Sequence, residues 1–244
     1  MASNIKTVSV LGGSGYIGKH CIYYLLKYTK SNVISISRSG NTNMSTYSDL
    51  TSDDLSRLSN FKCSALDKEK LKTPILKSDG VIHSIGTLLT LKDSSDENSY
   101  DTLSFKTAYV SSELIKENFD GKRKTNFVYI SAERGLMFPL SILFGDYILV
   151  KRKTEKYLTH LDCLNTNILR AGVVCHPKLR SWSVPIYHTV NLFNSLETNI
   201  LGNSIGEKIQ IPSKGTMLDN LADFAAKGSI GKLDKTIYSA NDMI

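Results

Sequence analysis

The sequence VSVLGGSGYIG at residues 8–18 is the strongest indication of the fold of this chain. An apolar run of β type leads into a glycine-rich turn, and the following KHCIYYLLKY has apolar side chains at helical spacing. Glycines let the backbone approach a phosphate, and the N–H groups and dipole at a helix N-terminus attract negative charge. Because Gly12, Gly15 and Gly18 lie between a strand and a helix, this pattern predicts a loop that binds a dinucleotide diphosphate. The alternative is a tight turn without a ligand.

The composition is that of an ordinary folded protein. With 244 residues, 41% of them hydrophobic and 22% charged, the chain can bury a sizeable core. Its longest apolar run, residues 136–150, is interrupted by Pro139, Gly145 and Asp146, so we expect no membrane span. We also expect no secretory signal, because the first β-type run begins near Ile5.

The net charge of the chain and the spacing of its cysteines and histidines limit the kinds of ligand that it could bind. The net charge of +7 suits phosphates, an anionic membrane surface or an acidic partner. The basic runs 122–124 and 151–153 lack interleaved aromatic residues, which favours solvated faces and argues against nucleic acid binding. The cysteines show no C-x-x-C spacing and the histidines form no i, i+3 or i+4 pairs, so the sequence predicts no metal site.

Runs of β type alternate with helical patterns along the chain. The β-type runs are Thr7–Leu11, Asn32–Ser37, Phe61–Leu66, Gly80–Ile85, Asn126–Ser131 and Thr166–Arg170, and the helical patterns are Lys19–Tyr28, Asp101–Glu117 and Asp146–Leu161. This order predicts an α/β fold with a doubly wound, Rossmann-like parallel sheet. We expect residues 1–176 to form this NAD(P)-binding domain. Residues 177–244, with a helical pattern at 184–196, are expected to form a small C-terminal lobe for a substrate or partner. The polar segment 39–60 predicts a mobile surface excursion.

The end of the second predicted strand indicates which dinucleotide binds. In NAD-binding folds of this type an acidic residue about 20 positions beyond the glycines holds the ribose 2′-hydroxyl. Here that position is Arg38, flanked by serines that include Ser39. Since a guanidinium binds phosphate bidentately, the sequence predicts NADP(H) in preference to NAD(H). The alternative is an exposed arginine in a polar loop.

Tyr147 and Lys151 form a Y-x-x-x-K pattern on one face of a predicted helix. Tyr23 and Lys27 repeat the spacing, but only Tyr147 follows the fifth strand, at the edge where doubly wound sheets bind ligands. Ser131 closes that strand, so we expect its hydroxyl and the phenol to converge on one carbonyl oxygen. The lysine is expected to lower the pKa of the phenol from about 10 towards 7, which makes Tyr147 a general acid/base. The alternative is a half-buried core tyrosine beside a surface lysine.

Together these segments resemble the short-chain dehydrogenase/reductase superfamily, in its extended or atypical branch, over Val8–Gly172. The resemblance rests on GGSGYIG, VIHSIG, YISAERG, YILVK and ILRAG. It implies that Ser131, Tyr147 and Lys151 are catalytic. It also implies cofactor contacts at Gly12, Ser14, Gly15, Tyr16, Ile17, Gly18, Arg38, Ser39, His83, Ser84, Gly86, Tyr147 and Lys151. The chain departs from the family at Ala171, where proline is usual, and at Ser104, near the place of an asparagine in many active members.

VIHSIGTLL, YISAERG and YILVKRKTE resemble a mitochondrial subgroup of this superfamily in particular. It contains the dehydrogenase-like accessory subunit of respiratory complex I and a subunit of the fungal coenzyme Q biosynthetic complex. The resemblance implies a protein on the matrix side of the mitochondrial inner membrane that binds NADP(H) and supports ubiquinone biosynthesis. Two alternatives stay open: a non-catalytic accessory subunit of complex I, and a soluble cytoplasmic reductase or epimerase of small metabolites. The triad is compatible with an NADP-dependent oxidoreductase without establishing turnover.

The apolar segment Leu136–Phe144 lies between Ser131 and Tyr147. We expect it to form a loop that lines a pocket for a lipophilic, quinone-type ligand, or that docks on a protein or makes peripheral contact with a membrane. Ordinary packing beneath the C-terminal lobe is the alternative.

Overall fold

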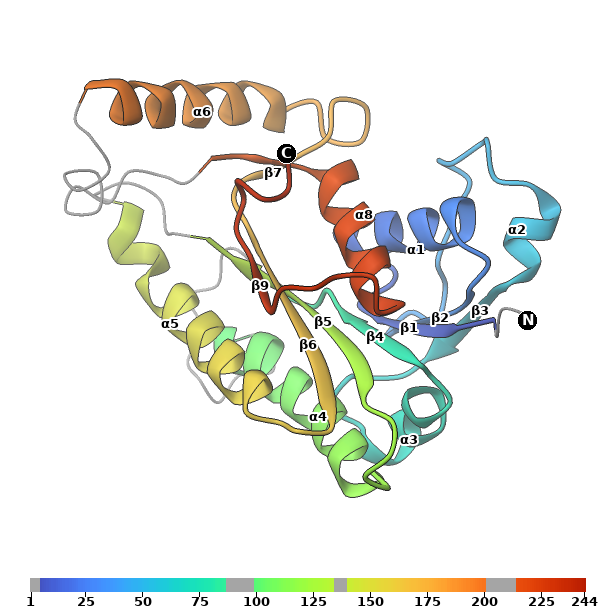
Figure 1. Cartoon of the computed structure of the whole chain (residues 1–244). Helices are drawn as coiled ribbons and strands as arrows, with labels where there is room; N and C mark the ends of the chain where they lie inside the picture. The colour runs from blue at the N-terminus through green and yellow to red at the C-terminus, as the bar shows by residue number, and fades with distance from the viewer. Residues whose placement is uncertain (1–4, 87–98, 134–139, 201–213) are drawn as a thin grey trace.

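A seven-stranded parallel sheet forms the centre of the molecule (Figure 1). The computed structural model describes residues 5–86, 99–133, 140–200 and 214–244. The strands are β1 (Thr7–Leu11), β2 (Asn32–Ser37), β3 (Leu58–Lys62), β4 (Gly80–His83), β5 (Thr125–Ala132), β6 (Leu164–Ala171) and β9 (Ile237–Tyr238). Their order is β3-β2-β1-β4-β5-β6-β9, and each neighbouring pair is parallel. The predicted α/β fold with a doubly wound sheet is confirmed.

Helices cover both faces of this sheet. On one face lie α1 (Tyr16–Tyr28) and α8 (Leu218–Ser229), and on the other lie α3 (Lys68–Leu76), α4 (Thr107–Glu117) and α5 (Leu140–Thr159) (Figure 1). A short π-helix, η1 (Asp101–Lys106), leads into α4, and α2 (Ser52–Ser56) lies between β2 and β3. The strands are apolar on both sides because each side faces a helical layer.

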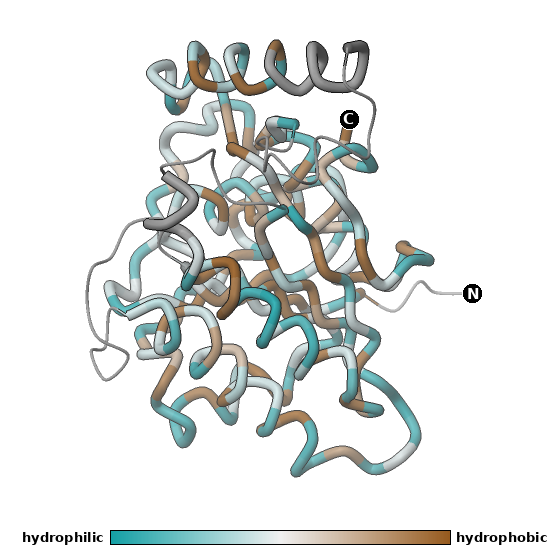
Figure 2. Tube along the Cα trace, turned by 90° about the vertical axis from the view of Figure 1, so that its left-hand side faces the viewer, coloured by the Kyte–Doolittle hydropathy of each residue, from teal (hydrophilic) through white to brown (hydrophobic). Residues whose placement is uncertain are grey.

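Two hydrophobic cores result, one on each face of the sheet. In β4, for example, Ile82 belongs to the core with α1 and α8, while Val81 belongs to the core with α3 and α4. Figure 2 shows hydrophobic residues concentrated along the central strands, whereas the outer helices are mixed. None of the helices in the described part of the chain has the length and apolar character needed to cross a bilayer.

Several predicted boundaries shift in the structure. The bounds of β1 and β2 agree with the sequence, but β3 begins at Leu58 instead of Phe61, because it is an edge strand with polar, exposed side chains and no apolar run. The excursion before it is partly anchored, since Thr42 and Met44 are buried. Helix α5 begins at Leu140 rather than Asp146, so part of the expected 136–144 loop is helical. Residues 136–139 and the side chains of 140–144 lie outside the described structure.

The C-terminal residues 177–244 divide between two places. Helix α6 (Ser183–Ile200) lies across the carboxyl end of the main sheet, and β7 (Val174–Cys175) pairs with β8 (Thr216–Met217) below it (Figure 1). Beyond β8, the apolar face of α8 packs on α1 and β9 pairs with β6. The last part of the chain therefore completes the main sheet and its helical layer, and only the α6 part lies over the carboxyl edge.

Candidate functional site

The glycine turn joins β1 to α1 at the point where the strand order reverses, between β1 and β4. Gly12 has a φ of +85°, which disfavours any side chain. A Cβ on Gly13 would lie 2.1 Å from Ser35 Oγ, and a Cβ on Gly18 would lie 2.3 Å from the carbonyl oxygen of Gly12. The turn is therefore packed against β2 and against its own backbone. The G-x-x-G-x-x-G pattern does not include Gly13, although the pair Gly12-Gly13 in the sequence could have indicated that this position also needs a glycine.

The N-terminus of α1 is open to an anion. The helix begins at Tyr16 after the N-cap Gly15, with no side-chain cap hydrogen bond and no acidic residue in its first turn. The first N–H groups of a helix have no partner within it, so this end carries uncompensated positive charge. Ser14 and Gly15 are exposed. The turn can thus present backbone donors to a phosphate.

Arg38 lies beside this turn. The N–H groups of Gly12 and Gly13 donate to the carbonyl oxygen of Ile36 at 2.9 and 3.2 Å, which fixes the turn to the end of β2. Arg38 follows that strand and is exposed, and within the described residues its guanidinium has no hydrogen bond or ion pair. Ser39 Oγ lies 3.2 Å from Ser37 Oγ. An unpaired cation therefore stands at the carboxyl edge, as the sequence predicts for a 2′-phosphate.

Tyr147 and Lys151 come together on α5. The Lys151 ammonium is 5.6 Å from the centroid of the Tyr147 ring and donates to the carbonyl oxygen of Ile130 at 2.9 Å. A Cβ on Gly86 would lie 3.5 Å from Lys151 Nζ, so the ammonium stands beside the residues that follow β4. The prediction that residues 151–153 form a solvated face is wrong for Lys151, which is buried because α5 packs this side onto β5.

Burial sets the proton affinities of this pair. Burial lowers the pKa of Lys151 to about 7, with the Glu155 carboxylate opposing the shift. Burial also raises the pKa of Tyr147 to about 12, and Tyr100, whose ring centroid is 5.3 Å away, adds to the rise. The expected fall in the pKa of the phenol is wrong, because desolvation dominates and the cation that opposes it is Arg152, not Lys151. Tyr147 therefore keeps its proton near neutral pH and suits the role of acid, not base.

Ser131 is engaged by a side chain that the sequence analysis missed. Its hydroxyl donates to Glu155 Oε1 at 2.5 Å, and both residues are buried. The other Glu155 oxygen accepts from Arg170 Nη2 at 2.6 Å, and Arg152 also contacts this carboxylate. Charge-assisted hydrogen bonds of this kind are strong. We expected the Ser131 hydroxyl to be available to a carbonyl oxygen. In the structure it is not, because it donates its hydrogen bond to the Glu155 carboxylate.

A signal for Glu155 was present in the sequence. Glu155 lies one helical turn after Lys151 in YILVKRKTE, and Arg170 lies in ILRAG, so both belong to segments that carry the family resemblance. Spacing along one helix places Glu155 near Lys151. Only the pairing of β5 with β6, which sets Ser131 opposite Arg170, brings the carboxylate to both.

His83 and Ser84, at the end of β4, were expected to contact a cofactor. In the structure both side chains form hydrogen bonds with other protein groups. His83 is fully buried, its Nε2 lies 2.8 Å from Thr107 Oγ1, and burial with the charge of Lys151 lowers its pKa to about 3. Ser84 Oγ donates to the carbonyl oxygen of Leu11 at 2.8 Å. These side chains tie β4 to its neighbours. The exposed Gly86 remains at the edge next to Lys151.

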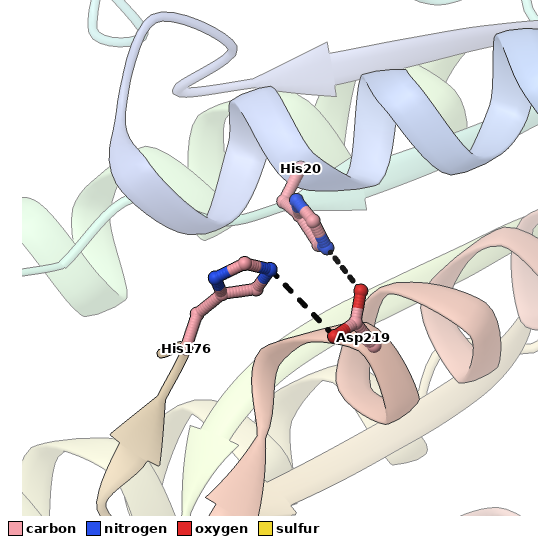
Figure 3. A group of neighbouring side chains, drawn as sticks. All are labelled: His20, His176 and Asp219. Atoms are coloured by element: carbon pink, nitrogen blue, oxygen red, sulfur yellow. Dashed lines mark hydrogen bonds and ion pairs between the residues drawn. The ribbon is translucent and has the colours of Figure 1, made fainter. Parts of the chain in front are cut away.

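Three potential metal ligands gather behind the glycine turn, although the sequence showed no metal spacing (Figure 3). His20 Nε2 is 2.9 Å from Asp219 Oδ1, and His176 Nε2 is 3.7 Å from Asp219 Oδ2. However, His176 Nδ1 accepts the N–H groups of Lys178 and Leu179 at 3.2 and 3.1 Å, which assigns the ring proton to Nε2. That nitrogen then has no lone pair for a metal, so the geometry favours a carboxylate that is hydrogen-bonded to His20 and faced by His176 at 3.7 Å.

Comparison with known proteins establishes the fold. No protein-family model and no curated sequence matches the chain. Among solved structures, a variant of ElxO with NADPH bound is similar with 18% identity and a TM-score of 0.66, covering 97% of each chain. A short-chain type dehydrogenase/reductase from Mycobacterium ulcerans is similar with 13% identity and a TM-score of 0.63, covering 100% of this chain and 91% of that one. The NADPH-dependent 3-quinuclidinone reductase from Rhodotorula rubra is similar with 13% identity and a TM-score of 0.66, covering 97% and 91%. The fold is therefore that of short-chain dehydrogenases/reductases.

Proposed function

We propose that this chain is an NADP(H)-binding protein of the short-chain dehydrogenase/reductase type with reductase-like chemistry. The observation that carries the proposal is the packed glycine turn, which leaves the N-terminus of α1 uncapped beside Arg38, a cation with no partner among the described residues. NADPH is the ligand that two of the similar structures are described as binding or depending on, which supports the same cofactor. NAD(H) is the weaker candidate, because no acidic residue occupies position 38.

Different residues at the carboxyl edge would bind different parts of the cofactor. The N–H groups of the glycine turn would hold the diphosphate, Arg38 and Ser39 the 2′-phosphate, and Lys151 with Gly86 the nicotinamide end. When bound, the cofactor would supply a hydride. Tyr147, which stays protonated, would give its proton to a carbonyl oxygen. Ser131 would support that oxygen only after its hydroxyl leaves Glu155.

Calorimetric titration with NADPH and NADH tests the cofactor. We expect the wild type to prefer NADPH by about tenfold or more, because a charge-assisted contact contributes about 1.5 to 3 kcal/mol. Arg38→Gln should remove the preference and leave NADH binding unchanged. Lys30→Gln, an equal charge change at the opposite end of β2, is the control and should bind as the wild type does. Equal wild-type affinities would contradict the preference, and no binding of either nucleotide would overturn the proposal.

For the biological role, we propose a mitochondrial protein on the matrix side of the inner membrane that supports ubiquinone biosynthesis. The support is the resemblance of VIHSIGTLL, YISAERG and YILVKRKTE to the coenzyme Q and complex I subgroup. Its proposed partners are subunits of the coenzyme Q biosynthetic complex, with a lipophilic quinone-type ligand and peripheral contact with the membrane. The hydrogen bond between Ser131 and Glu155 favours a second candidate, a non-catalytic accessory subunit of complex I, because the serine is occupied.

Native mass spectrometry of the protein isolated from its own cells separates these roles. Co-purification with coenzyme Q enzymes would support the first role, and co-purification with complex I the second. A free protein that turns over NADPH would contradict both, and would indicate a soluble cytoplasmic reductase or epimerase. Retained nucleotide would be seen in the same spectrum.

A further inference from the structure

A second arginine, which forms no ion pair within the part of the chain that the structure describes, lies against the first residue of α1. The Arg180 guanidinium carbon is 3.9 Å from the centroid of the Tyr16 ring, and Tyr16 is the first residue of α1. Arg180 is exposed and makes no ion pair with any described carboxylate. The hydroxyl of Tyr16 is buried and has no hydrogen-bond partner among the described atoms. A cation and an unsatisfied phenol thus meet beside the N-terminus of α1.

The segment that carries Arg180 contacts α1 and α8 through His176. The N–H of Arg180 donates to the carbonyl oxygen of His176 at 2.9 Å, closing a turn between them. His176 points its Nε2 at Asp219 on α8, which also accepts from Nε2 of His20, one helical turn after Tyr16 (Figure 3). The His20 and His176 rings lie edge to face at 5.3 Å. We call this arrangement of His20, His176 and Asp219 the carboxylate latch.

The surroundings of Arg180 supply the rings of Tyr16 and Trp182 and the N-terminus of α1, but no ion-paired carboxylate among the described residues. A guanidinium on an aromatic ring gains a cation–π contact, but it lies close to the positive end of a helix dipole that has no acidic residue in its first turn. A bound diphosphate would compensate both charges. Arg38 lies on the β2 side of the turn, so it is placed for a different group.

Resting on the proposed function, we propose that Arg180 clamps the diphosphate of the dinucleotide against the glycine turn, and that the carboxylate latch holds its segment in place. Arg180 would therefore be a binding residue for any nicotinamide dinucleotide, with or without a 2′-phosphate. His176 and Asp219 are positioning residues, since their polar contacts among the described residues are with that segment and α1. Arg38 and Arg180 then have separable effects, the first on selectivity and the second on overall affinity.

Titration of Arg180→Gln with NADPH and with NADH tests the clamp. We expect both affinities to fall by about the same factor, roughly tenfold for an exposed charge-assisted contact, with the NADPH to NADH ratio unchanged. Lys178→Gln, which removes an exposed cation from the same segment, is the matched control and should bind as the wild type does. Unchanged affinities for both nucleotides, or a loss confined to NADPH, would overturn the clamp. A wild type that binds neither nucleotide would instead refute the proposed function.

A double-mutant cycle tests the latch. Asp219→Asn should weaken NADPH binding severalfold in the wild-type background but add nothing in the Arg180→Gln background, because it acts through Arg180. A purely structural role would give equal losses in both backgrounds and would overturn this part. His176→Gln provides a second variant if Asp219→Asn lowers the melting temperature enough to prevent titration. The melting temperature of each variant is measured beside its affinity.

Discussion

The glycine turn and the group formed by Lys151 and Glu155 of α5 with Ser131 of β5 differ in whether their polar groups already have partners. At the turn, the helix end is uncapped and Arg38 is unpaired within the described structure. On α5, Lys151 already donates to a backbone carbonyl oxygen and Ser131 already donates to Glu155. The turn is therefore preformed for an anionic ligand, whereas the α5 groups must exchange an internal partner before they can act on a substrate.

The cost of that exchange follows from burial. Glu155 is 4% exposed, and it depends on Ser131, Arg170 and Arg152 for its hydrogen bonds. A buried carboxylate that loses one of three donors keeps two cations, so release of the serine alone is far less costly than loss of the whole set. A ligand that does not hydrogen-bond to Glu155 must offset the lost hydrogen bond between Ser131 and Glu155 through its own contact with Ser131.

The largest expected effect comes from filling the turn. In Gly18→Ala, the new Cβ would lie 2.3 Å from the carbonyl oxygen of Gly12 and 2.6 Å from Ser84 Oγ. We expect loss of nucleotide binding and a fall of about 3 kcal/mol in the free energy of unfolding, since the backbone must move. Gly145→Ala is the control, because a Cβ there meets nothing within 4 Å on an exposed part of α5. Denaturant unfolding and titration check both, and full binding by Gly18→Ala would show that the turn is not tightly packed.

A smaller effect is expected from Glu155→Gln. The substitution leaves Arg170 without its ionic partner, and because this arginine is 27% exposed we expect a loss of about 2 kcal/mol. Glu117→Gln breaks the exposed pair with Lys68 and should change stability far less, because solvent screens this pair. Urea unfolding measures both. If the two variants lost the same amount, the α5 groups would be no more firmly partnered than surface ions, and the contrast with the turn would disappear.

The last expected effect is a slope with pH instead of a fixed loss of stability. Because the pKa of Lys151 is lowered from 10.5 to about 7, the unfolded chain binds a proton between these pH values that the folded chain does not. Stability linked to this residue is therefore lowest below about pH 7 and rises as pH increases, by at most about 1.4 kcal/mol per pH unit. The difference in unfolding free energy between wild type and Lys151→Met should increase from pH 7 to 9.

Lys153→Met on the same helix is the control for this slope. Its side chain is 53% exposed and paired with Asp101, so its difference from the wild type should stay flat over the same range. Parallel curves for the wild type and Lys151→Met would show that Lys151 is solvated, against the burial described above.

Local patterns predicted those parts of the fold that depend on runs of apolar residues. The bounds of β1 and β2 agree with the structure because apolar, mostly β-branched residues recur along each strand between turn residues. The edge strand β3 has exposed polar residues, and β9 has two residues, so neither has a local signal of that kind. The catalytic roles of Ser131, Tyr147 and Lys151 stay predictions. Their hydrogen-bond partners, and the directions in which the pKa values of Tyr147 and Lys151 shift, could be found only from the packing of the folded chain.

The alternation of strands and helices, the glycine turn and the arginine that follows β2 can be read from local sequence, because each is encoded by residues close together in the chain. The tertiary structure decided which side chains are already partnered. Glu155 meets Ser131 and Arg170 only because β5 and β6 pair, and Asp219 meets His20 and His176 only because α8 returns to α1. Such contacts join residues far apart in sequence, and the desolvation that accompanies them has no counterpart in local spacing.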